Sequence, residues 1–200
     1  FSFSNEYSQG TDNIIFTSKY GRKKLAQTKI LAGLIFSIST IIVHIFLDYA
    51  MIFICCGFDG FDLSIQLLNL ACPYRLNMLQ ASMLMIFFII LMSVFMSCFT
   101  LFVSSISKKS SVPIAATSSI VMITYFLHLS EVSKLWNRIY LLLPKNLLEE
   151  VFSKSYLSYF SYEIFGRVAD LISMRIGLYI LLIILTVSLT IMAFRRHQIY

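Results

Sequence analysis

The side chains best placed to do chemistry in this sequence are His44 and Asp48, which lie four positions apart in an apolar stretch. Residues four apart share one face of a helix. An ionisable group at the centre of a bilayer costs about 2.5–3.5 kcal/mol to insert, so it faces protein or a wet path. Two interpretations stay open: a lining of a transport route, or hydrogen bonds between closely packed helices. The candidate path residues on this face are Ser37, Thr40, His44 and Asp48, with Gly33 continuing it.

Motifs of bond-making enzymes are missing from the sequence. It has neither the G-x-x-x-x-G-K-[ST] phosphate loop of ATP-binding proteins nor the H-E-x-x-H of zinc proteases. Glu149 and Glu150 are followed only by His197, whereas intramembrane proteases of the prenyl-protease type use a glutamate pair and several later histidines. We therefore expect no catalytic residues, no metal site, no cofactor and no ATP hydrolysis by this chain itself.

The four cysteines do not have the spacing of a metal site. Cys98 falls in an apolar run, where a cysteine acts as a small core residue. Cys55, Cys56 and Cys72 are expected near the outer surface, where an oxidising compartment permits disulfides. The sequence allows a Cys56–Cys72 bridge and does not decide whether it forms.

The composition indicates a chain that crosses a membrane several times. Of its 200 residues 58% are hydrophobic, and the mean hydropathy is +0.80. A soluble domain does not need so much apolar surface. The first residue is Phe rather than Met. Because the residues after it resemble the end of a helix leaving the membrane, we expect the chain to be incomplete at its N-terminus.

Four apolar runs predict membrane spans, since each is long enough, or nearly so, to cross about 30 Å of hydrocarbon. The shortest run, the third, should stand nearly upright in the bilayer. Together they predict an all-α polytopic helical bundle that forms one transmembrane domain over residues 1–200. The predicted spans are residues 30–54, 78–103, 112–129 and 176–194.

Residues 130–175 form the longest predicted connection, on the outer side of the membrane. Its apolar and aromatic segments are too short to cross, so they predict short interfacial helices at the level of the lipid headgroups. The first should end at Pro144. The second should begin at Asn146, with Glu149 three positions later as in a capping box.

The charged residues predict the orientation of these spans. Segments 1–29, 105–111 and 195–200 hold nine basic and two acidic residues, whereas segments 55–77 and 130–175 hold seven of each. Lys and Arg bias neighbouring loops toward the cytoplasm. We therefore expect a multi-pass protein of the cell membrane, bacterial in type, with both ends cytoplasmic. The net charge of +6 then reflects topology, and no nucleic-acid-binding module is visible.

The segment before the first span combines a turn, a short apolar helix and a basic stretch. Gly10 and Thr11 can open a helix, because a threonine hydroxyl accepts hydrogen bonds from the unpaired N–H groups at a helix start. A short helix with exposed apolar anchors has the chemistry to insert into a groove of a partner protein. The anchors would be Ile14, Ile15 and Phe16.

The order of residues in this segment resembles the cytoplasmic loop of permease subunits of ABC-type exporters, in the drug, bacteriocin and polysaccharide export superfamily. The family pattern is F-x-x-E, three residues, G-T, a short apolar helix, T-x-P-x-S-R, then a basic turn and a lysine where the next span begins. This sequence departs from it at Lys19, in place of proline, and at Gly21, in place of serine. The matching residues are Phe3, Glu6, Gly10, Thr11, Ile14, Ile15, Phe16, Thr17, Arg22 and Lys29.

The resemblance implies a permease subunit of an ATP-driven exporter, in which the four predicted spans are the third to sixth of six. Implied partners are cytoplasmic ABC ATPase subunits, a second copy or a sister permease, and the lipid bilayer, but no nucleic acid. The alternative is an ATP-independent carrier, or a structural membrane protein, that uses His44 and Asp48. The residues implied to couple the chain to the ATPase are Glu6, Gly10, Thr11, Ile14, Ile15, Phe16 and Arg22.

Overall fold

The computed structural model describes most of the chain and groups it into two compact units. Unit 1 consists of Phe1–Ser39, Ser93–Ile123 and Ile180–Tyr200, and unit 2 consists of Thr40–Met92 and Thr124–Tyr179. Each long helix begins in one unit and ends in the other. The described residues are 3–4, 24–57, 59–67, 72–126, 134–144, 161–164 and 166–196.

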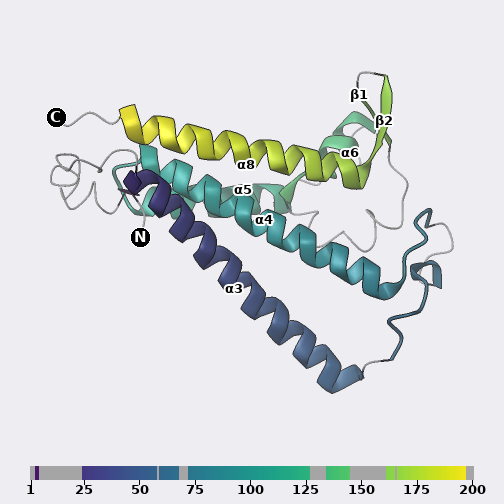
Figure 1. The fold of residues 1–200 in the computed structure, drawn as a ribbon. Coiled ribbons are helices and arrows are strands. Elements are labelled where there is room, and N and C mark those ends of the chain that lie inside the picture. The colour runs from purple at the N-terminus through teal and green to yellow at the C-terminus, as the bar shows by residue number, and fades with distance from the viewer. Residues whose placement is uncertain are drawn as a thin grey trace. The chain divides into compact units, whose positions relative to one another are not determined.

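Three helices in the described ranges are long and apolar enough to cross a membrane: α3 (Lys24–Cys56), α4 (Met78–Ile106) and α8 (Leu171–Arg196) (Figure 1). The predicted mostly helical, membrane-embedded chain is therefore confirmed. The fourth predicted span coincides with α5 (Ser111–Phe126), which has 16 residues. These 16 residues reach about 24 Å, short of the ~30 Å hydrocarbon thickness, and residues 127–129 of the predicted span lie outside the description. Three spans are therefore shown among the described residues.

Local hydrogen bonds set the C-terminal end of α3 and the start of α4. Gly57 closes α3 in the left-handed conformation, at φ 77°, and its N–H donates to the Phe53 carbonyl over 3.1 Å. Asn77 precedes α4, and its N–H donates to Oε1 of Gln80 over 3.1 Å, which is half of a capping box. Both α3 and α4 extend beyond the predicted spans, because hydropathy marks the apolar centre of a helix and not its ends.

The connection from α3 to α4 folds back on itself within unit 2. Its short 3₁₀-helix η1 (Ile65–Leu67) is held by a backbone bond from Ile65 N–H to the Leu76 carbonyl, 2.9 Å long. The Cys72 side chain is buried there, with its Sγ 3.7 Å from the Tyr74 carbonyl oxygen. The side chain of Cys56 lies outside the described part, so the Cys56–Cys72 bridge stays untested.

The structure describes a short helix and a strand pair within the predicted outer connection 130–175. Helix α6 (Lys134–Tyr140) occurs where a short helix ending before Pro144 is expected. The predicted helix starting at Asn146 lies outside the described residues. The residues nearest α8 are not helical but form an antiparallel pair, β1 (Ser161–Ile164) and β2 (Arg167–Asp170). The tight connection contains Gly166 at φ 75°, which a two-residue hairpin turn favours.

Helix α8 begins five residues before the predicted span. Asp170 ends β2 and stands directly before α8, and its Oδ1 accepts a hydrogen bond from the Ser173 hydroxyl in the first turn. This aspartate fits the role of N-cap. Because of the earlier start, Arg175 is part of the helix and not of the preceding loop.

Candidate functional site

The residues predicted to couple the chain to an ATPase lie outside the described residues. The structure does describe the two flanks of their segment, namely Phe3 and Ser4 on one side and the start of α3 on the other. Both flanks belong to unit 1. The residues without a structural description are Glu6, Gly10, Thr11, Ile14, Ile15, Phe16 and Arg22.

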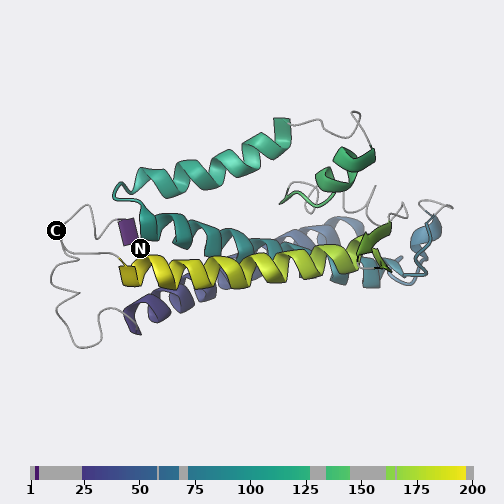
Figure 2. The same cartoon turned by 90° about the horizontal axis from the view of Figure 1, so that it is seen from above.

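The two flanks meet in one buried cluster, here called the Phe3 junction. Figure 2 shows the short N-terminal segment, in purple, near the ends of α4 and α8. The Phe3 ring is fully buried, and its centroid lies 4.8 Å from that of Phe194 in α8. An aromatic pair at this spacing contributes about 0.5–1.5 kcal/mol beyond the area it buries. The junction consists of Phe3, Ser4, Ala26, Ile30, Leu101, Ser104 and Phe194.

The polar part of the junction joins residues a hundred positions apart. The Ser4 N–H donates to the Ser104 Oγ of α4 over 3.0 Å, and the Ser104 hydroxyl donates to the Ser4 Oγ over 3.3 Å. Both serines are fully buried. Buried polar groups need such partners, because leaving one unsatisfied costs about 1–3 kcal/mol. The pair therefore fixes the position of Ser4 on α4.

A cation contacts the same aromatic ring from α3. The Lys29 ammonium nitrogen lies 4.5 Å from the centroid of the Phe3 ring. A cation within about 6 Å of a ring is attracted to its face. Phe3 and Lys29 are the first and last residues of the motif described above, so this contact joins the two ends of the motif.

Close packing of α3 on α4 continues from this junction. A Cβ atom added to Gly33 would lie 3.0 Å from a terminal methyl of Leu101, tighter than ordinary contacts. A glycine at this point lets the two helices approach closely. Gly33 therefore packs against α4, in agreement with the packing interpretation of this face.

The candidate path residues occupy α3 without forming a closed site within the described chain. Ser37 is half-buried, and its hydroxyl donates to the Leu34 carbonyl of its own helix over 3.0 Å. Thr40, His44 and Asp48 are exposed. The Nδ1 of His44 lies 2.8 Å from the Thr40 carbonyl oxygen, one turn back in the helix. The structure thus brings His44 and Thr40 together and leaves both ionisable side chains on an outer face of α3.

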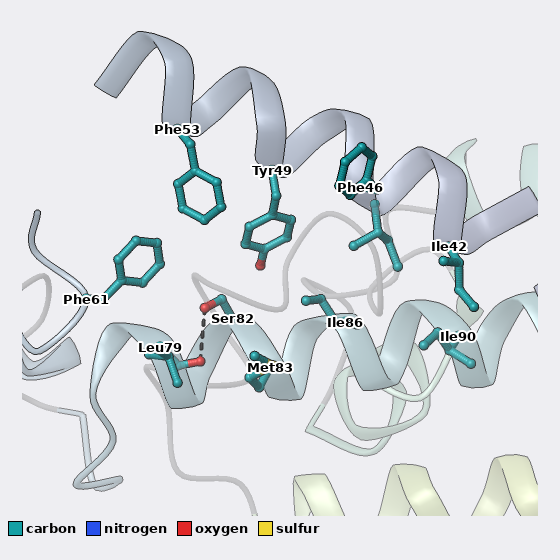
Figure 3. A pocket seen from close by; sticks show the side chains of 11 residues that line it. Ile42, Phe46, Tyr49, Phe53, Phe61, Leu79, Ser82, Met83, Ile86 and Ile90 are labelled. Carbon is teal, nitrogen blue, oxygen red and sulfur yellow. Dashed lines mark hydrogen bonds between the residues drawn. The ribbon is translucent and has the colours of Figure 1, made fainter. Parts of the chain in front are cut away.

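A groove lies between α3 and α4 within unit 2, with a volume of about 560 Å³ (Figure 3). Tyr49 and Phe53 line it from α3, Phe61 from the following loop, and Met83 and Ile86 from α4. Its only hydroxyls among the lining residues belong to Tyr49 and Ser82, and the Ser82 hydroxyl donates to carbonyls of its own helix. The groove can accept apolar groups but supplies no acid, base or nucleophile. His44 and Asp48 are not among its lining residues.

A second polar cluster, here called the Arg175 cluster, lies in unit 2. The fully buried Arg175 donates from Nε and Nη2 to the Leu141 carbonyl, over 3.0 and 2.6 Å. The Tyr179 hydroxyl donates to the Leu142 carbonyl over 3.1 Å, and the Tyr162 hydroxyl to the Arg138 carbonyl over 2.8 Å. These acceptors lie at the end of α6, where helix carbonyls lack partners and carry partial negative charge.

The Arg175 cluster was not predicted from the sequence. The only signal was an arginine one turn inside a long apolar run, where a charge needs a partner. Two effects act on the pKa of Tyr162 in opposite directions. Burial raises it, whereas the positive charges of Arg175 and Arg138 lower it. Burial is the larger effect, so the pKa lies above its ordinary value. The neutral phenol is therefore the stable form that donates to the Arg138 carbonyl.

Within the described ranges, no three His, Cys, Asp or Glu residues come together as a metal site would need. The contacts described above position helices and loops relative to one another within each unit. Comparisons with models of protein families, with curated proteins and with solved structures give no match for this chain.

Proposed function

We propose that this chain is the membrane-spanning permease subunit of an ATP-driven ABC exporter. In this proposal, the chain lies in a bacterial plasma membrane with both ends cytoplasmic. Separate ATPase subunits bind segment 5–23 and hydrolyse ATP, and the chain itself makes or breaks no bonds. The observation that carries the proposal is the contact between the two ends of the motif, with Lys29 4.5 Å from the Phe3 ring. A segment that docks on a partner protein needs both of its ends held in place, and this contact joins the two ends of the motif.

The distribution of charge between the units supports the proposed orientation. Lys24, Lys29, Lys108 and Lys109 all fall in unit 1. All five described acidic residues fall in unit 2, beside five of the eleven described basic residues; the acidic residues are Asp48, Asp59, Asp62, Glu163 and Asp170. Basic residues beside the spans favour the cytoplasmic side. The basic residues of unit 1 that flank the spans would then lie on the side of the ATPase subunits.

The exposure of α3 supports a partner within the membrane. Only 6% of its most apolar stretch is buried, against 28% for α4 and 17% for α8. His44 and Asp48 lie on this exposed helix. Because ionisable groups in a bilayer face protein or water, a second copy or a sister permease should cover this part of α3 or enclose a wet path beside it.

The direct test is purification of the chain from its native membranes, followed by identification of a P-loop ATPase and measurement of ATP hydrolysis. We expect the ATPase to co-purify with the wild-type chain and to be lost when Ile14, Ile15 and Phe16 are all changed to alanine. The matched control changes Leu63 and Leu67, which are also apolar and are exposed in unit 2, to alanine. Equal ATPase recovery with the triple variant and the wild type would remove the coupling role.

The alternative is a proton-coupled carrier, favoured by the exposed His44 and Asp48 on a membrane-spanning helix. It predicts that efflux of fluorescent amphipathic dyes follows the pH gradient and persists when ATP is depleted. It also predicts loss of efflux in Asp48→Asn. Efflux that stops with ATP depletion and is unchanged in Asp48→Asn would exclude the carrier.

A further inference from the structure

The apolar groove between α3 and α4 begins near the middle of both membrane-spanning stretches. Its innermost lining residues are Ile42 of α3 and Ile90 of α4. Each lies two positions from the central residue of its stretch, which is Ala26–Cys55 in α3 and Met78–Ile106 in α4. In a bilayer that the two helices cross, the inner end of the groove therefore lies close to the bilayer centre.

The length of the groove matches one leaflet of a bilayer. The lining continues along α3 from Ile42 to Phe53, and along α4 from Ile90 to Leu79, up to the α3–α4 connection (Figure 3). These eleven steps on each helix extend about 16 Å at 1.5 Å per residue. Half of a ~30 Å hydrocarbon core is about 15 Å. The groove thus extends from the bilayer centre to the level of the lipid headgroups.

The groove is narrow and accessible from the side. Its volume of about 560 Å³ over a length of about 16 Å corresponds to a mean cross-section of about 35 Å². A helix with its side chains is about 10–12 Å across, or about 80 Å² or more in section, so a helix does not fit inside. Phe46 and Met83 at the rim are exposed. A hydrocarbon chain in the surrounding lipid can therefore enter the groove sideways.

One hydroxyl stands in the apolar lining at the level of a lipid ester. The Tyr49 hydroxyl points from α3 toward α4 and has no hydrogen-bond partner among the described residues (Figure 3). Tyr49 lies nine positions from the central residue of its stretch, which is about 13 Å along the helix. The hydrocarbon core ends about 15 Å from its centre. The ester carbonyls of a phospholipid lie at that boundary and can accept a hydrogen bond from a phenol.

The charges described in the α3–α4 connection favour a zwitterionic headgroup. Asp59, Asp62 and Arg75 are exposed there. The Leu79 N–H donates to the Phe61 carbonyl over 3.1 Å, which holds the loop with the two aspartates against the start of α4. An ammonium group would find carboxylates, and a phosphate would find a guanidinium. A headgroup with a phosphate alone would meet more negative than positive charge.

We propose that this groove binds one acyl chain of a phosphatidylethanolamine molecule from the leaflet beside the α3–α4 connection. The Tyr49 hydroxyl donates to the ester carbonyl, and the headgroup lies among the charges of the connection. The bound chain fills the space between α3 and α4 and so completes the packing of this part of unit 2. The inference does not depend on the proposed function, because it needs neither an ATPase nor a particular side of the membrane.

Two methionines provide matched variants. Met83 lines the groove and is 60% exposed, whereas Met51 of α3 does not line it and is 63% exposed. Met83→Trp should lower lipid occupancy about 10-fold, because the larger side chain excludes about two methylenes from the groove. Met51→Trp adds the same atoms elsewhere and should change nothing. Tyr49→Phe keeps the shape but loses the hydroxyl, so occupancy should fall about 2- to 10-fold.

The first arm of the test measures occupancy. The chain, with any partner subunits that accompany it, is placed in vesicles of equal parts phosphatidylethanolamine and phosphatidylglycerol and then released into detergent for native mass spectrometry. We expect one phosphatidylethanolamine per chain in the wild type and in Met51→Trp, and its loss in Met83→Trp. Equal retention of the two lipids, no retained lipid in the wild type, or equal occupancy in both tryptophan variants overturns the inference.

The second arm locates the chain with a phosphatidylethanolamine that carries a photoactivatable diazirine in one acyl chain. Adducts should form on lining side chains such as Phe46 and Met83 and not on Met51. Adducts spread equally over all three mean surrounding lipid only and overturn the inference. Cross-links from the groove to a second copy of the chain, in place of lipid, also overturn it.

A second filling variant covers the case in which Met83→Trp does not fold. Ile42→Trp fills the groove from the side of α3, where Ile42 is an exposed lining residue. A loss of bound phosphatidylethanolamine in this variant supports the inference, and wild-type occupancy contradicts it. Neither result bears on the ATPase, so the proposed function stands or falls separately.

Discussion

The Phe3 junction and the Arg175 cluster both hold distant segments together, but they use different interactions. The junction packs apolar side chains around the Phe3 ring, places the Lys29 ammonium against the same ring and adds one neutral serine pair. The cluster buries a guanidinium and directs it, with two tyrosine hydroxyls, at carbonyls near the end of α6. Hydrogen bonds from a charged donor are worth about 1.5–3 kcal/mol each, against about 1 kcal/mol for neutral ones.

Because of this difference, we expect the free energy needed to break the hydrogen bonds to be smaller in the Phe3 junction than in the Arg175 cluster. The serine pair can break and re-form at modest cost, because no charge is exposed to an apolar surrounding. Release of Arg175 from the Leu141 carbonyl would leave a buried cation poorly compensated, which costs several kcal/mol. We therefore expect the Arg175 cluster to stay closed while the Phe3 junction adjusts.

The largest expected effect is that of Arg175→Met, which removes both charged hydrogen bonds to the Leu141 carbonyl. The free energy of unfolding should fall by about 3 kcal/mol or more, seen as a lower melting temperature in detergent. The control is Arg167→Met on the exposed strand β2, which should change stability little. Equal melting temperatures for the two variants would contradict the contrast drawn between the regions.

Next in size is Gly33→Val, which introduces side-chain atoms where a Cβ already lies 3.0 Å from Leu101. Overpacking of this kind costs about 1–3 kcal/mol, and here it would also push Leu101 out of the Phe3 junction. Gly177→Val is the matched control, since a Cβ there meets nothing within 4 Å. Melting temperatures of the two variants test this, and that of Gly33→Val should be the lower one. If Gly177→Val is the more damaging of the two, α3 and α4 do not pack as closely as described.

A smaller effect is expected for Tyr162→Phe, which loses the hydroxyl that donates to the Arg138 carbonyl. A neutral hydrogen bond of this kind contributes about 1 kcal/mol. The variant should therefore melt slightly below the wild type at pH 8. A loss as large as that of Arg175→Met would mean that the charge of Arg175 is not what distinguishes this cluster.

The smallest effect concerns alkaline pH. Burial raises the pKa of Tyr162 above its ordinary value, so the folded chain keeps the phenol proton where the unfolded chain, with a pKa of about 10, loses it. This contribution to stability is complete below about pH 10 and is lost as the pH rises through the raised pKa. Melting temperatures from pH 8 to 11 should fall less steeply in Tyr162→Phe. If the melting temperatures of the wild type and Tyr162→Phe fall equally with pH, the raised pKa of Tyr162 is contradicted.

Features of the fold that depend on residues close together in the sequence could be predicted, whereas those that depend on distant residues could not. The apolar runs located α3, α4 and α8, because burial in hydrocarbon depends on local composition. The hairpin at residues 161–170 was missed because strands of four residues show too little alternation, and only Gly166 marked the turn. The helix start before Arg175 was missed because hydropathy does not register a capping aspartate.

The candidate site shows the same limit. The motif in the first segment was proposed from the spacing of its residues, and that assignment stays a prediction. The contact of Ser4 with Ser104 could not, because it joins residues a hundred positions apart and depends on how three helices pack. For His44 and Asp48 the sequence left packing and transport open. The structure adds that both are exposed on α3, where a covering partner would decide between the two.

The proposed function depends most on which side of the membrane holds segment 5–23. Thr11→Cys and Val168→Cys, each in a background without native cysteines, can be labelled with a membrane-impermeant maleimide in intact cells and after lysis. We predict labelling of Val168→Cys in intact cells, and of Thr11→Cys only once the membrane is opened. Labelling of Thr11→Cys in intact cells would put the segment outside, where no ATPase could reach it, and would contradict the proposed function.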